Sequence, residues 1–116
     1  PARPFKQIVE FCSMIRITVA YPAQDNARFD HSYYQQQHAR LIHEQLDAHG
    51  LLKLEVDQCL ADGAGQAPQF VACAHLFFAD MAQFQAAFAA GGKALNQDMA
   101  NYTDITPVVT ISQVVA

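Results

Sequence analysis

The 116-residue sequence contains no tryptophan, only seven lysines and arginines, and only three cysteines. Eleven acidic residues bring the formal net charge to −4, and no basic run is present, which argues against a nucleic-acid partner. The cysteines Cys12, Cys59 and Cys73 are odd in number and form no CxxC pair. This pattern favours free thiols in the reducing cytoplasm over a disulfide framework or a zinc site. No apolar run approaches the ~20 residues that a membrane span needs, so no membrane partner is expected.

The length predicts one domain built around a single core. Residues 1–13 carry two prolines, no hydrophobic period and no apolar core of a secretory signal. Met14 then opens an alternating segment. We therefore expect 1–13 to be a leader or extension outside the fold, and 14–116 to form the folded domain.

Hydrophobic periodicity predicts four strands and two helices. Asp30 and Asp80 are the expected N-caps, and Gly50 is the expected end of the first helix. Gly91 and Gly92 lie in the middle of the second helix and predict a break or kink there. In chain order the expected elements are a strand over 14–21, a helix over 30–49, strands over 51–60 and 70–79, a helix from Met81 to Met99, and a strand over 108–115.

The order strand, helix, strand, strand, helix, strand is the split βαβ arrangement of α+β, ferredoxin-like folds, with a four-stranded, mainly antiparallel sheet. Both helices should cover one face of that sheet. The segment 70–79 is nevertheless apolar on both faces, since Val71, Cys73 and Phe77 oppose the inward set, and 108–115 is similar. A second copy of the sheet is the simplest cover for the open face, which predicts a homodimer.

The first helix carries polar chemistry on its buried stripe. Tyr34 and His38 are four residues apart, so a phenol and an imidazole should line the same small volume. His38 is either a core histidine bonded to a backbone carbonyl, or a general acid or base that titrates near neutral pH. The expected inward side chains, of which Leu41 and Ile42 should line a pocket, are Tyr34, His38, Leu41, Ile42 and Leu46.

Further polar residues have two possible roles each. Tyr34 either packs or hydrogen-bonds a substrate oxygen. His75 lies in the most apolar strand and is either structural or part of the pocket. Tyr102 precedes the last strand, where it would close the pocket mouth. Tyr33 and His43 fall off the buried stripe and are expected to be solvated.

The histidine spacing does not favour a metal site. His31 and His38 are two helical turns apart, and His38 and His43 point to different sides of the helix. We therefore expect no bound metal and no cofactor.

Several motifs, taken in order, resemble the EthD family, small proteins named after a component of bacterial ethyl tert-butyl ether degradation. The resemblance covers residues 14–115, nearly all of the chain outside 1–13. Its marks are Tyr21-Pro22, Asp30-x-x-Tyr33-Tyr34 with His38, His75-Leu76-x-Phe78, Phe84-x-x-Ala87-Phe88, and Asn101-Tyr102-Thr103-Asp104 followed by Pro107.

The resemblance implies a dimeric α+β barrel, in which two ferredoxin-like sheets close together, with a pocket between helices and sheet in each copy. It favours a cytoplasmic homodimer that acts on a small hydrophobic ligand in a degradative pathway by cofactor-free acid/base chemistry through His38. A non-catalytic carrier or accessory protein for an oxygenase is the first alternative. A structural or stress-related dimer with a filled pocket is the second. Some barrels of this kind bind haem, for which His75 or His38 would be the axial ligand.

Overall fold

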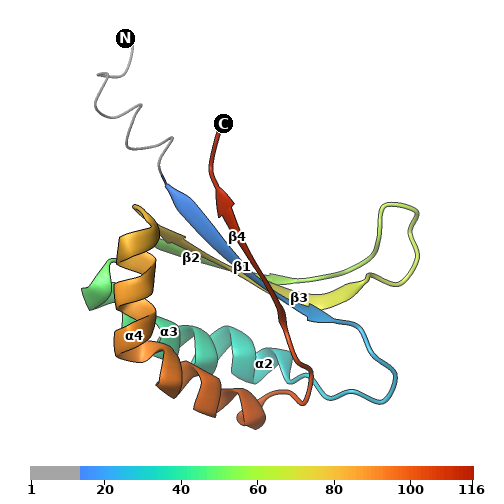
Figure 1. The fold of residues 1–116 in the computed structure, drawn as a ribbon. Coiled ribbons are helices and arrows are strands. Elements are labelled where there is room, and N and C mark those ends of the chain that lie inside the picture. Colours follow the sequence, from blue (N-terminus) through green and yellow to red (C-terminus); the bar gives the residue numbers. More distant parts are fainter. Residues whose placement is uncertain (1–13) are drawn as a thin grey trace.

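The computed structural model describes residues 14–116, so the predicted leader over 1–13 lies outside the described part of the chain. The elements follow the predicted order (Figure 1). Within the described residues, none of the helices has the length and hydropathy to cross a bilayer. The elements are β1 (Ile15–Pro22), α2 (His31–Tyr33), a π-helical turn (Tyr34–His38), α3 (Ala39–Leu46), a 3-10 turn (Asp47–His49), β2 (Lys53–Gln58), β3 (Phe70–Phe78), α4 (Met81–Asp98), a 3-10 turn (Met99–Asn101) and β4 (Val108–Gln113).

The sheet has the strand order β2-β3-β1-β4, and every neighbouring pair is antiparallel. The helices form one layer on a single face of the sheet, and the other face is open (Figure 1). This arrangement is the ferredoxin-like α+β fold that the sequence predicts. Ile17 marks the covered face, since it is 1% exposed and pairs with Leu76 of β3 on one side and Ile111 of β4 on the other.

The side chains of β3 alternate as predicted. Every second residue is buried under the helices, while Val71, Cys73, His75 and Phe77 lie half-buried on the open face. The apolar side chains of β4 that share the face of Ile17 are Val109 and Ile111, so these two point toward the helical side of the sheet. They remain about half exposed because the helices do not extend over this edge strand.

The two edge strands are shorter than predicted. β2 and β4 were each expected to span more residues. Beyond the ends of β2, single bonds still join Leu52 N to Phe77 O and Cys59 N to Val71 O, whereas β4 ends where β1 begins. The ladder of β4 ends with Gln113 opposite Ile15, the first residue of β1, and one further bond joins Val114 N to Met14 O at 2.8 Å.

The first helix begins and ends as predicted but is not regular throughout. Asp30 caps its start by accepting a hydrogen bond from Tyr33 N at 3.0 Å. Gly50 ends it with a φ of 104°, the left-handed conformation that glycine adopts without strain. Between these residues the helix widens into a π turn, which periodicity does not reveal.

The expected break at Gly91 and Gly92 is wrong, because α4 runs without interruption from Met81 to Asp98. The physical reason is the contact between α4 and α3. A Cβ atom on Gly91 would lie 2.8 Å from Gln45 Cβ and 2.9 Å from the backbone oxygen of Gln45. Gly91 therefore allows two helix backbones to approach closely, and the packing compensates for its low helix propensity.

Candidate functional site

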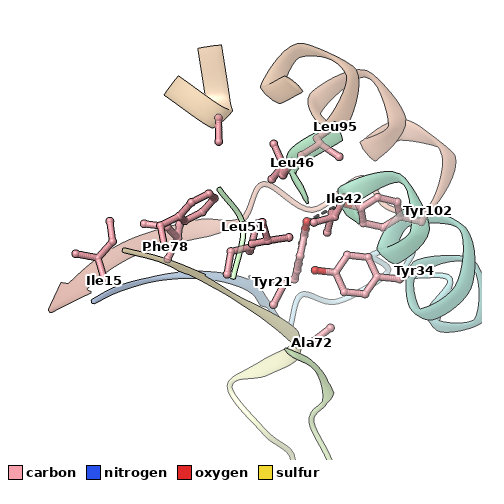
Figure 2. Packing of buried hydrophobic residues seen from close by; sticks show 14 of the residues in the cluster. Ile15, Tyr21, Tyr34, Ile42, Leu46, Leu51, Ala72, Phe78, Leu95 and Tyr102 are labelled. Atoms are coloured by element: carbon pink, nitrogen blue, oxygen red, sulfur yellow. Dashed lines mark hydrogen bonds between the residues drawn. The ribbon is translucent and has the colours of Figure 1, made fainter. Parts of the chain in front are cut away.

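A small cavity of about 110 Å³ lies between the helical layer and the sheet. Most of its wall is apolar, with Ile42 from the first helix and further side chains from the sheet and α4. At one end the wall is polar. Figure 2 shows the rings of Tyr21, Tyr34 and Tyr102 gathered there between sheet and helices, and His38 lines the same end.

The π turn positions two of these side chains. Ala39 N donates to Tyr34 O, the bond that spans five residues and defines this wider turn. A wider turn holds more residues than an α-helical one, so residues four apart lie more nearly above one another. The rings of Tyr34 and His38 accordingly stack, with centroids 5.4 Å apart and planes 14° apart.

Asp98, at the end of α4, is the partner of His38. Its Oδ2 lies 2.9 Å from His38 Nδ1, although the two residues are 60 positions apart. Its Oδ1 accepts hydrogen bonds from Tyr33 OH at 2.6 Å and from Asn101 Nδ2 at 3.0 Å. The carboxylate is thus held by three donors, each from a different element or turn.

The environment separates the protonation states of this pair. Burial lowers the pKa of His38 below its ordinary value of 6.5, and the bond to Asp98 only partly opposes that shift. Burial raises the pKa of Asp98, but hydrogen bonds from Tyr33, His38 and Asn101 outweigh it and leave the pKa below 3.8. At neutral pH Asp98 is therefore ionised and His38 neutral. The proton of the imidazole sits on Nδ1, facing the carboxylate, and Nε2 keeps its lone pair.

The three phenols form a second hydrogen-bonded group. Tyr21 OH and Tyr102 OH are 2.6 Å apart, and the ring of Tyr34 packs edge-on against that of Tyr21, with centroids 5.5 Å apart. Tyr102 OH lies 3.4 Å from His38 Nε2, a long contact that leaves this nitrogen weakly engaged. Burial raises the pKa of all three phenols, so each is a neutral hydroxyl at physiological pH.

Tyr102 does not lie at the pocket mouth, and that expectation is wrong. Its side chain is 0% exposed and forms part of the buried end of the cavity. The 3-10 turn Met99–Asn101 carries the chain inward, and Asp30 N donates to Tyr102 O at 2.8 Å. The segment before β4 is therefore anchored to the start of the first helix.

His75 does not line the cavity. It lies on the open face of the sheet, where Nε2 is 2.9 Å from Asp57 Oδ2 and Nδ1 is 3.1 Å from Thr18 Oγ1. Leu41 is partly buried against the core and is also absent from the cavity wall. The structure thus brings together Tyr34, His38, Ile42 and Tyr102 and separates the other two predicted residues from them.

Tyr33 and His43 were both expected to be solvated. For Tyr33 that expectation is wrong, since its side chain is partly buried against the core and its hydroxyl binds Asp98. For His43 it is confirmed: half of the side chain is exposed, and Nδ1 pairs with Asp47 Oδ1 at 2.9 Å. Asp98 itself was missed. Its position three residues after Leu95, on the buried stripe of α4, was the available signal.

No three His, Cys, Asp or Glu side chains of residues 14–116 come close enough together to hold a metal ion. The polar residues that line the cavity are three tyrosines, His38 and Asn96. These groups donate and accept hydrogen bonds, and the imidazole can also take up a proton.

Fold and site together define a ferredoxin-like α+β protein with a histidine–carboxylate pair beside a cavity. The family model described as the EthD domain matches residues 22–106, and the chain belongs to the EthD family. This confirms the resemblance noted in the sequence. A search among curated proteins gave no match.

Solved structures agree with this assignment. The crystal structure of an EthD-like protein from Ralstonia eutropha JMP134 is 38% identical, with a TM-score of 0.83 over 90% of this chain and 94% of that chain. An EthD family protein from Bacillus halodurans C-125 is 19% identical, with a TM-score of 0.69 over 87% and 98%. A hydroxynitrile lyase from Passiflora edulis is 14% identical, with a TM-score of 0.66 over 89% and 94%. The last two similarities concern the fold alone.

Proposed function

We propose that this protein is an enzyme that moves a proton on a small apolar substrate without a cofactor, with His38 as the proton carrier. The observation that carries this proposal is the 2.9 Å contact between His38 Nδ1 and Asp98 Oδ2, made by an imidazole that also lines the cavity. A neutral imidazole whose Nε2 lone pair is only weakly engaged, here by Tyr102 OH at 3.4 Å, is a general base at neutral pH.

Asp98 supports this role in two ways. It fixes the tautomer, because a proton on Nδ1 leaves Nε2 as the acceptor. It also stabilises the imidazolium that forms when Nε2 takes a proton, since the carboxylate stays ionised beside it. Tyr34 and Tyr102 supply neutral hydroxyls at the same end of the cavity, where they can hydrogen-bond a substrate oxygen.

The test is deuterium uptake in D2O by a panel of lactones and ketones, followed by proton NMR. Wild-type protein should catalyse exchange at neutral pH and lose activity as the pH falls through the pKa of His38, below 6.5, because protonation of Nε2 removes the base. Since Asp98 raises the pKa of His38, Asp98→Asn should shift the midpoint to lower pH and slow exchange by at least about tenfold.

Two results would contradict the proposal. Exchange by Asp98→Asn with the wild-type rate and midpoint would show that the pair has no catalytic role. Binding of panel compounds with no exchange at any pH would instead identify a carrier, the second candidate, which the largely apolar cavity wall favours.

We also propose that the chain forms a homodimer through the open face of its sheet. Val71 and Phe77 of β3 lie on that face, and Val108 of β4, which pairs with Ala20, is 51% exposed there. A partner sheet would remove these apolar groups from water.

Sedimentation equilibrium at micromolar concentration is expected to give about twice the chain mass. Val108→Asp should shift the protein to monomer, because it would bury a carboxylate at the interface. Ile111→Asp is the matched control: Ile111 is 47% exposed but lies on the helical side of the sheet, and this variant should stay dimeric. A monomeric wild type, or a dimer broken only by Ile111→Asp, would contradict the open-face interface.

A further inference from the structure

The cavity wall offers no charge to a ligand. Among the described residues, the ionisable side chains that line it are three tyrosines and His38, all neutral at physiological pH. Asp98 lies behind His38, and both its oxygens are occupied by hydrogen bonds. A carboxylate, phosphate or ammonium group in this space would lose its hydration and gain no counter-charge.

The size of the cavity limits the ligand further. An apolar cavity of about 150 Å³ in another protein holds one benzene molecule. The present cavity of about 110 Å³ is of the same order, and Pro107 and Val109 form part of its wall. Val109 is 55% exposed, so the cavity reaches the surface along this edge. The space therefore admits at most a single ring, and a larger substituent would project past β4.

The phenol group can hold one oxygen atom of a ligand. Three hydroxyls carry three protons, and the hydrogen bond between Tyr21 and Tyr102 uses one of them. The contact between Tyr102 OH and His38 Nε2, at the long distance of 3.4 Å, engages a second only weakly. The Tyr34 hydroxyl, whose residue also lines the cavity, can donate its proton to a ligand oxygen. A carbonyl oxygen, which only accepts hydrogen bonds and has two lone pairs, matches such donors.

We infer that the ligand is an uncharged, single-ring ketone or lactone, with its carbonyl oxygen on the phenol group and the neighbouring C–H toward His38 Nε2. The role of that C–H rests on the proposed function. In the proposed reaction, the C–H bond breaks and its proton forms an N–H bond on Nε2. The electron pair of the C–H bond moves toward the carbonyl oxygen, which gives an enolate. Return of a proton from Nε2 to carbon regenerates the base and the carbonyl.

Tyrosine fluorescence can measure the binding directly. The sequence has four tyrosines and no tryptophan, and three of the tyrosines line the cavity. Wild-type protein is titrated at pH 7.5 with cyclohexanone and with cyclohexanecarboxylate, with N-acetyltyrosinamide as the control for collisional quenching. The ketone should bind at least about tenfold more tightly than the carboxylate. Equal or tighter binding of the carboxylate, or no binding of the ketone, would overturn the inference.

A pair of variants tests whether the absence of charge on the cavity wall causes the ketone to bind more tightly than the carboxylate. Asn96 of α4 lines the cavity and is exposed, while its neighbour Gln97 is exposed but does not line it. Asn96→Lys should bring carboxylate binding within about threefold of ketone binding, since it adds a cation at the cavity, and Gln97→Lys should leave the preference unchanged. The same change in both variants, or in neither, would overturn the inference.

These outcomes are distinct from those of the proposed function. Ketone binding with no deuterium exchange would refute the proton transfer and leave the ligand class standing. Deuterium exchange confined to anionic substrates would refute the ligand class and leave the proton transfer standing.

Discussion

Replacing His38 with leucine is expected to slow deuterium exchange by at least about 10²-fold, because leucine removes the only imidazole at the cavity among the described residues. The free energy of unfolding should change by no more than about 1 kcal/mol. Asp98 Oδ2 loses its partner, but Oδ1 keeps the hydrogen bonds from Tyr33 and Asn101, so the carboxylate stays hydrogen-bonded. Exchange is measured by NMR and stability by urea unfolding.

His43→Leu is the matched control. It removes a histidine from the same helical region that also pairs with an aspartate, but this pair is solvent-exposed and away from the cavity. It should leave exchange at the wild-type rate. If His38→Leu retained exchange and cost about 1–3 kcal/mol of stability, His38 would be a satisfied core histidine and no proton carrier.

Gly91→Ala is expected to destabilise the fold by about 1–3 kcal/mol, despite the higher helix propensity of alanine. Its new methyl group would meet Gln45 on α3, whose Cβ and backbone oxygen lie within 3 Å of the Cβ position. A backbone atom cannot move aside as a side chain can, so α3 and α4 would have to separate. Urea unfolding measures the loss.

Gly92→Ala supplies the comparison at the next residue. There the nearest atom to an added Cβ is Phe88 Cδ2 at 3.2 Å, a side-chain atom that can shift slightly. This variant should be neutral or gain up to about 1 kcal/mol from helix propensity. If both variants behaved alike, the close approach at Gly91 would not limit helix packing.

Much of the fold could be predicted because its signals are local. Alternation and 3.6-residue spacing gave the element order, and Asp30, Asp80 and Gly50 gave caps that depend on a few neighbouring residues. The kink expected at Gly91 failed because a glycine in a helix has two opposite meanings. It weakens an isolated helix, yet it permits contact with another one, and only the position of α3 decides between them.

The candidate site was harder to predict because its central contact is not local. His38 and Tyr34 share one helix face, so their proximity follows from spacing. Asp98 pairs with His38 across 60 residues and resembles any polar residue near a helix end. Tyr33 also binds Asp98 across 65 residues, a long-range contact that α-helical periodicity does not reveal.

Because β4 is an edge strand, the part of the cavity wall that borders solvent is separate from the His38–Asp98 pair. Val109 and Pro107 belong to that part of the wall, whereas His38 and Asp98 are held between the helices. Replacing Val109 with a larger or smaller side chain would reshape the entrance without disturbing any hydrogen bond of the pair. Variants of this chain can therefore differ in the compounds that they admit through changes along one strand, while the His38–Asp98 pair stays intact.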